Sequence, residues 1–243
     1  MNRVNFKAFV ILQLMAVLVP FVNVTAQKRD WANLQRYAKS DSVIMRQFNN
    51  GKRVVFMGNS ITEGWYRSHP DFFKNNGYIG RGIGGQTSFQ FLVRFRQDVI
   101  NLHPAVVVIN AGTNDIAENT QAYNQDYTMG NIMSMVELAK ANGIYVILTS
   151  TLPSDCYFWN KKVKDVPSKI EALNLRIKQY AKLNHLPYVD YYKSLVVKPS
   201  GAFIPSMTKD GVHPNANGYD VMEKIIKKYI DKALKEIEKK GKK

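Results

Sequence analysis

The stretch Arg53-Val-Val-Phe-Met-Gly-Asn-Ser-Ile-Thr62 joins a short apolar run to a small polar segment. An apolar run closed by glycine is typical of a strand buried on both faces of a sheet. A serine directly after such a strand, at the start of a helix, exposes its hydroxyl where the helix N-terminus favours negative charge. Ser60 can therefore be a nucleophile or simply a helix cap, and these residues alone favour neither.

Further strands are predicted at residues 78–80, 105–110, 144–149 and 187–190, with helical patterns between them. One such helix has apolar residues at helical spacing from 170 to 181 and Pro167 near its start, where proline is tolerated. Strands that alternate with helices predict an α/β domain whose parallel sheet is covered on both faces. Ligands of such sheets bind beyond the carboxyl ends of the strands.

Two more polar segments follow predicted strands. Gly80-Arg-Gly-Ile-Gly-Gly-Gln-Thr-Ser88 matches a dinucleotide fingerprint by spelling, but no acidic residue follows about 20 positions later to hold a ribose. Its glycines can instead present a backbone N–H to an anion. In Ala111-Gly-Thr-Asn-Asp115, Asn114 offers an amide donor at the same edge of the sheet, although asparagine and aspartate are also common in turns.

The segment Asp210-Gly-Val-His-Pro214 places a carboxylate three residues before an imidazole on a short turn. The carboxylate can then hold one ring nitrogen of His213. The other histidines, His69, His103 and His185, lack an acidic residue at this spacing, and we expect them to be surface or packing residues.

With these four segments in order, the sequence resembles the SGNH hydrolase (GDSL-like) family, and within it the acetylhydrolase-like branch. The family's Ser, Gly, Asn and His blocks match Ser60, Gly85, Asn114 and His213, with Asp210 three residues before the histidine. The resemblance implies a three-layer α/β/α sandwich with a mainly parallel, flavodoxin-like sheet.

The resemblance also implies a serine esterase with Ser60, Asp210 and His213 as catalytic triad. The oxyanion hole would consist of the N–H groups of Ser60 and Gly85 and the side-chain amide of Asn114. No metal or organic cofactor is required. One residue departs from the family pattern: Asn59 stands where the family usually has aspartate, and we expect activity to persist because Asn59 is not a triad member.

The substrate is less well defined. The resemblance favours short acyl groups, with acetyl esters on carbohydrates as one candidate. A lysophospholipase or thioesterase of the same fold, or an inactive glycan-binding module, are the alternatives. Tyr157, Phe158 and Trp159 are adjacent in a segment without regular periodicity that leaves the sheet at the predicted catalytic edge. They either pack beneath the loop or form a wall of the substrate pocket.

The first 26 residues predict a secretory signal, with Arg3 and Lys7 before an apolar run and the small-residue pattern Val24-Thr25-Ala26 at its end. Residues 27–243 then form the hydrolase domain of a periplasmic or secreted protein. Cys156 is the chain's one cysteine, which excludes an internal disulfide.

The formal net charge of the chain is +15, and residues 221–243 contain nine lysines against four acidic residues. The lysines alternate with apolar residues at helical spacing, which predicts a surface helix with a solvated basic face. Weak contact with anionic surfaces is the alternative. No nucleic-acid-binding motif accompanies the charge, so we expect no nucleic-acid partner.

Overall fold

The computed structural model describes residues 30–241, so the predicted signal segment lies outside the described part of the chain. Five parallel strands form the central sheet in the order β2-β1-β3-β4-β5. Their bounds are β1 Val54–Gly58, β2 Tyr78–Gly82, β3 Val106–Ile109, β4 Tyr145–Thr149 and β5 Tyr188–Val189. The parallel, flavodoxin-like sheet is therefore confirmed, with β2 two residues longer than predicted.

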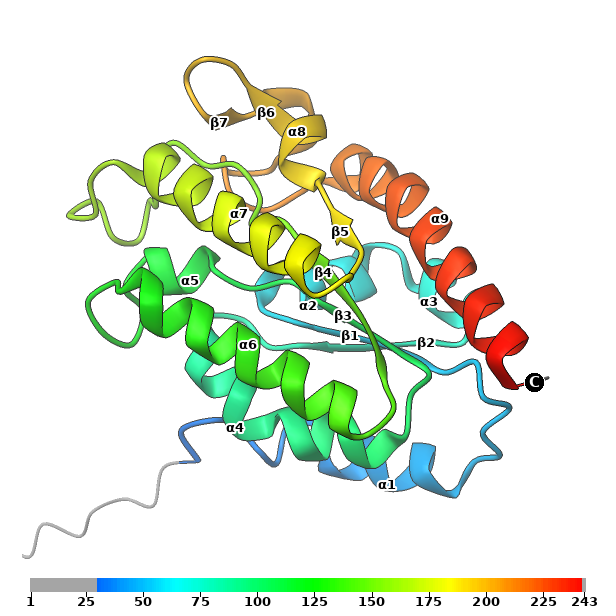
Figure 1. The fold of residues 1–243 in the computed structure, drawn as a ribbon. Helices are drawn as coiled ribbons and strands as arrows, with labels where there is room; N and C mark the ends of the chain where they lie inside the picture. The colour runs from blue at the N-terminus through cyan, green and yellow to red at the C-terminus, as the bar shows by residue number, and fades with distance from the viewer. Residues whose placement is uncertain (1–29, 242–243) are drawn as a thin grey trace, which may run out of the picture.

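Helices cover both faces of this sheet (Figure 1). They are α1 Ala38–Arg46, α2 Ser60–Ser68, α3 Pro70–Asn76, α4 Ser88–Asp98, α5 Thr113–Ile116, α6 Gln125–Ala141, α7 Val166–Leu183, α8 Tyr191–Leu195 and α9 Ala216–Gly241. Single 3-10 turns span Ile100–Leu102 and Pro205–Met207, and a small hairpin pairs β6 Val196–Val197 with β7 Ala202–Phe203. The hairpin and α1 were not predicted from the sequence.

Alternation along the strands divides the core into two layers. Val55 and Met57 of β1 pack with apolar side chains of α4, α6 and α7, whereas Val54 and Phe56 pack with those of α2, α3 and α9. Because side chains on a strand alternate between faces, one wholly apolar strand supplies both layers. The three-layer α/β/α arrangement is confirmed.

The C-terminal helix α9 forms as predicted. Its apolar side, which includes Met222, Ile226, Ile230 and Ala233, is buried against the sheet. Lysines occupy the exposed side, at positions 224, 228, 232, 235 and 239. Within residues 30–241, none of the helices combines the length and apolar character that a membrane span requires.

Candidate active site

Ser60 is the first residue of α2, directly beyond the carboxyl end of β1. Asn59 is the N-cap of this helix, and its Oδ1 accepts a hydrogen bond of 3.0 Å from the Ile61 N–H. Gly58 allows the sharp strand-to-helix turn, since a Cβ at this position would collide with the Thr62 side chain. The helix cap is therefore Asn59, and the Ser60 hydroxyl is left for another partner.

That partner is His213, which is 153 residues from Ser60 in the sequence but adjacent to it in the fold. Ser60 Oγ lies 2.9 Å from His213 Nε2, and His213 Nδ1 lies 2.8 Å from Asp210 Oδ2. Asp210 Oδ1 also accepts hydrogen bonds from the backbone N–H groups of Val212 and His213. One carboxylate thus shapes the turn and holds the imidazole at the same time.

The ionisation of Asp210 reflects two opposing effects. Partial burial raises the pKa of this carboxyl, while the hydrogen bonds from His213 and Val212 lower it, and the net pKa lies below its ordinary value. Hydrogen bonds to the charged form outweigh desolvation here. Asp210 is therefore a carboxylate at neutral pH.

Two hydrogen-bond donors face Ser60 from the adjacent strand ends. Gly85 has a φ of +76°, a left-handed conformation that glycine adopts without strain. Asn114 is buried at the start of α5, and its Nδ2 donates one hydrogen bond of 2.9 Å to the Gln86 carbonyl. An amide carries two hydrogens, so the second remains for a ligand. Among residues 30–241, the N–H groups of Ser60 and Gly85 have no hydrogen-bond partner.

A pocket of about 330 Å³ opens over these groups. Its lining includes Ser60, Gly85, Asn114 and His213, together with Asn119, Phe158 and Trp159. The structure therefore brings together, in one cavity, the four residues on which the sequence resemblance rested.

Asn119 is the lining residue that sequence reasoning missed. Its Nδ2 donates to the Gly85 carbonyl at 3.0 Å, and its Oδ1 accepts from the Trp159 indole N–H at 2.8 Å. It connects the glycine loop with the aromatic wall. A polar residue in an irregular loop carries no local signal of such a contact, because the contact depends on folding between distant segments.

The three adjacent aromatic residues divide between pocket and core. Phe158 and Trp159 are 54% and 38% exposed and line the pocket. Tyr157 is completely buried in the core and packs beneath Trp159, with ring centroids 5.1 Å apart. The prediction of substrate contact fails for Tyr157 because neighbouring residues of an irregular segment point to opposite sides. Cys156, before it in this loop, is an exposed free thiol.

His69 belongs to a different cluster, with Asp220 and Glu223. His69 Nδ1 lies 2.6 Å from Glu223 Oε1, which also accepts from the Trp65 indole N–H. Two ligands of one tetrahedral metal ion would stand about 3.4 Å apart. The geometry is that of a hydrogen-bonded pair, and it agrees with the expectation that His69 is a packing residue.

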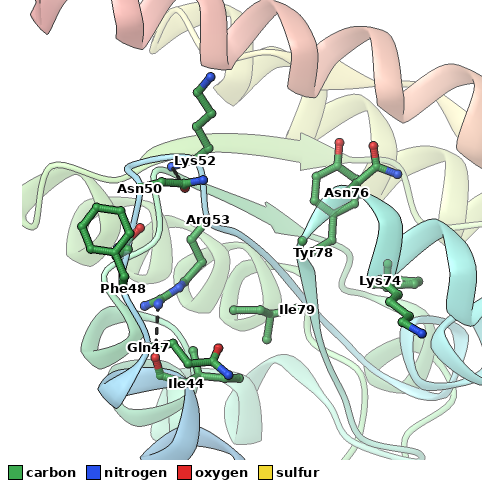
Figure 2. A pocket seen from close by; sticks show the side chains of 13 residues that line it. Ile44, Gln47, Phe48, Asn50, Lys52, Arg53, Lys74, Asn76, Tyr78 and Ile79 are labelled. Carbon is green, nitrogen blue, oxygen red and sulfur yellow. Dashed lines mark hydrogen bonds between the residues drawn. The ribbon is translucent and has the colours of Figure 1, made fainter.

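A second cavity, of about 350 Å³, lies at the opposite edge of the sheet, where β1 and β2 begin (Figure 2). Arg53 points across it, and its guanidinium donates to the carbonyls of Ile44 and Leu102. The residues that line this cavity include no serine, histidine or carboxylate. The lining therefore offers no serine–histidine pair for acyl transfer.

The family model described as GDSL-like lipase/acylhydrolase matches residues 56–221, a span that contains Ser60, Gly85, Asn114, Asp210 and His213. The chain belongs to this family. As a GDSL-like acylhydrolase it is a carboxylic ester hydrolase.

Two Bacteroides structures are similar over nearly their whole length. A GDSL-like lipase from Bacteroides thetaiotaomicron is 63% identical, with a TM-score of 0.82, covering 83% of this chain and 98% of its own. A Bacteroides fragilis protein assigned to the acylhydrolases is 65% identical, with a TM-score of 0.84, covering 85% and 100%.

Two other similarities are more limited: one is a shared fold at low sequence identity, and the other covers only part of the chain. An acetyl xylan esterase shares the fold at 22% identity and a TM-score of 0.60, over 73% of this chain and 98% of its own. The lipoprotein YqeF of Bacillus subtilis is 32% identical over 117 residues, which is 41% of this chain and 48% of YqeF. The similarity thus spans about half the length of that curated relative.

Proposed function

We propose that this GDSL-like acylhydrolase is an exported serine esterase that removes short acyl groups, chiefly acetyl, from carbohydrate esters. The observation that carries the proposal is the hydrogen-bonded series Asp210–His213–Ser60, which opens into a small pocket walled by Phe158 and Trp159. Export is supported by the N-terminal sequence pattern and by the partial similarity to a lipoprotein.

The mechanism begins with attack of Ser60 Oγ on the ester carbonyl carbon, while His213 Nε2 accepts the hydroxyl proton. Asp210 stabilises the imidazolium that forms. The N–H groups of Ser60 and Gly85 and the free amide hydrogen of Asn114 receive the oxyanion of the tetrahedral intermediate. The bond to the sugar oxygen breaks, and this oxygen takes the proton from Nε2.

Water completes the cycle. It attacks the acyl group on Ser60, again with His213 as proton acceptor, and the carboxylic acid leaves as Ser60 recovers its proton. Apart from water and the ester, every group in these steps is a side chain or backbone N–H of the chain itself.

Pocket size favours short acyl groups. The volume beside Ser60 is about 330 Å³, which is near the lower limit for ligand pockets and suits a small acyl group. We expect kcat/KM for p-nitrophenyl esters to fall on the order of tenfold or more from acetate to octanoate. A chain-length series beside acetylated xylo-oligosaccharides measures this. Highest activity on long acyl chains would favour the lysophospholipase or thioesterase alternative, and glycan binding without hydrolysis would favour the binding module.

Trp159 is the candidate platform for the sugar ring. Trp159→Ala should raise KM for an acetylated xylo-oligosaccharide roughly tenfold, because a stacking surface is lost, and should change KM for p-nitrophenyl acetate far less. Trp159→Phe keeps a ring while removing the indole N–H that Asn119 accepts. Tyr127→Ala, on the exposed face of α6, is the control. Equal losses on both substrates would assign Trp159 to packing instead.

A further inference from the structure

Residues 30–37, here called the N-terminal strap, precede α1 and lie outside the span that the family model matches. They have no regular secondary structure, yet Ala32 within them is buried. The carbonyls of Trp31 and Leu34 bind side chains of α4, and three further contacts lead to the segment 82–86. This segment, here called the glycine loop, carries the Gly85 N–H of the proposed oxyanion hole. Two of the three contacts are direct, and one passes through Glu63.

The first contact holds the end of the loop. Gln86 Nε2 donates to the Ala32 carbonyl at 2.7 Å, and Gln86 Oε1 accepts from the buried guanidinium of Arg94 at 2.6 Å. The Gln86 backbone carbonyl accepts from Asn114. Gln86 is therefore held by three partners: the strap at Ala32, the buried Arg94, and Asn114 of the proposed oxyanion hole.

The second contact passes through Glu63 of α2. Arg36 of the strap pairs with Glu63 Oε1 at 3.0 Å, and Glu63 Oε2 accepts from the Gly84 N–H at 2.9 Å. Arg67 pairs with the same Oε1. Gly84 directly precedes Gly85, so a carboxylate held by the strap sets the position of the adjoining peptide.

The third contact is made by Tyr37, the last residue of the strap. Its hydroxyl donates to the Gly82 carbonyl at 2.5 Å, and its ring lies 4.5 Å from the Arg81 guanidinium, which pairs with the buried Asp41. Burial raises the pKa of Tyr37, so its hydroxyl remains a donor at neutral pH. The start of the loop is thereby fixed to the strap as well.

We infer that the strap positions the glycine loop so that the Gly85 N–H points at the developing oxyanion, an inference that rests on the proposed function. Gly84 and Gly85 are adjacent and Gly85 is left-handed, so the free loop would sample many conformations. Oxyanion donors accelerate acyl transfer only when they are oriented before the charge develops. Contacts on both sides of the two glycines supply this orientation.

The test uses the full chain with Tyr37→Phe, Arg36→Ala and the double variant. Each single change should lower kcat for p-nitrophenyl acetate about three- to tenfold with little change in KM, because each removes one hydrogen bond that orients the loop. The affinity for phenylboronic acid, whose adduct with Ser60 is tetrahedral and anionic, should fall by a similar factor. The double variant should lose more than either single variant.

Ser42→Ala is the matched control, since this α1 hydroxyl donates to the Lys39 carbonyl and not to the glycine loop. It should leave kcat and boronate affinity unchanged. If the strap variants lower Tm without changing kcat or boronate affinity, the strap only stabilises the fold and the inference is wrong. An inactive wild-type protein would contradict the proposed function itself, which separates the two failures.

Discussion

Ser60→Ala is expected to lower kcat/KM for p-nitrophenyl acetate by a factor on the order of 10⁴ to 10⁶. Without the hydroxyl, no acyl-enzyme forms, and residual hydrolysis comes only from substrate binding and the oxyanion donors. Ester assays and labelling by a fluorophosphonate, which should add once to the wild type and not to the variant, measure the effect.

Ser68→Ala is the control for this substitution. Ser68 is exposed at the other end of the same helix, so the variant removes an identical hydroxyl away from the pocket. It should retain full activity and full labelling. A Ser60→Ala variant that retains full esterase activity would exclude Ser60 as the nucleophile.

Asp210→Asn should lower kcat by about 10³- to 10⁴-fold. An amide can still accept the Val212 and His213 backbone N–H groups through its oxygen, so the turn should persist. Its NH₂ group cannot accept from Nδ1, however, and the imidazole loses the tautomer that leaves Nε2 free to take a proton. Steady-state kinetics and circular dichroism on the same samples separate lost catalysis from lost structure.

Asp190→Asn supplies the comparison for Asp210→Asn. Asp190 caps α8 by accepting from the Lys193 N–H, a similar carboxylate role without a histidine. It should leave kcat unchanged. Equal activity of both variants at neutral pH would show that Asp210 does not act through His213.

The pKa of Asp210 is lower in the folded protein than in the unfolded chain. The ionised carboxylate therefore stabilises the folded state at pH values above the unfolded pKa, and this stabilisation disappears as the pH falls through the folded pKa.

The sheet could be predicted because β1, β3 and β4 are almost wholly apolar and each is followed by a polar or glycine-containing segment. Val54 to Met57 needed no tertiary information to identify, since a parallel strand buried on both faces has a continuous apolar signature. The edge that carries the site followed from topology, since the carboxyl ends of parallel strands meet at one edge. That Ser60, Gly85 and Asn114 are neighbours there followed from the flavodoxin-like strand order that the family resemblance implied.

What escaped prediction depends on contacts between distant backbone groups. The strap is bound partly through its own backbone carbonyls. Because every residue type has the same backbone carbonyl, the sequence carries no sign of these contacts. Arg94 is another example, since a helical arginine is normally exposed. It is wholly buried because the carbonyls of Gly58 and Arg81 converge on it from two strand ends, with Asp98 as counter-charge. Such convergence exists only in the assembled fold.

The exposed thiol of Cys156 offers a practical means of observing the pocket loop. It is the chain's single cysteine and lies three residues before Trp159, so a maleimide fluorophore would attach at one defined place without any engineering. Partial burial and the neighbouring Asp155 raise the pKa of this thiol, and the thiolate is the reactive form. Conjugation should therefore proceed faster at mildly alkaline pH, and the attached dye would report ligand entry as a change in emission.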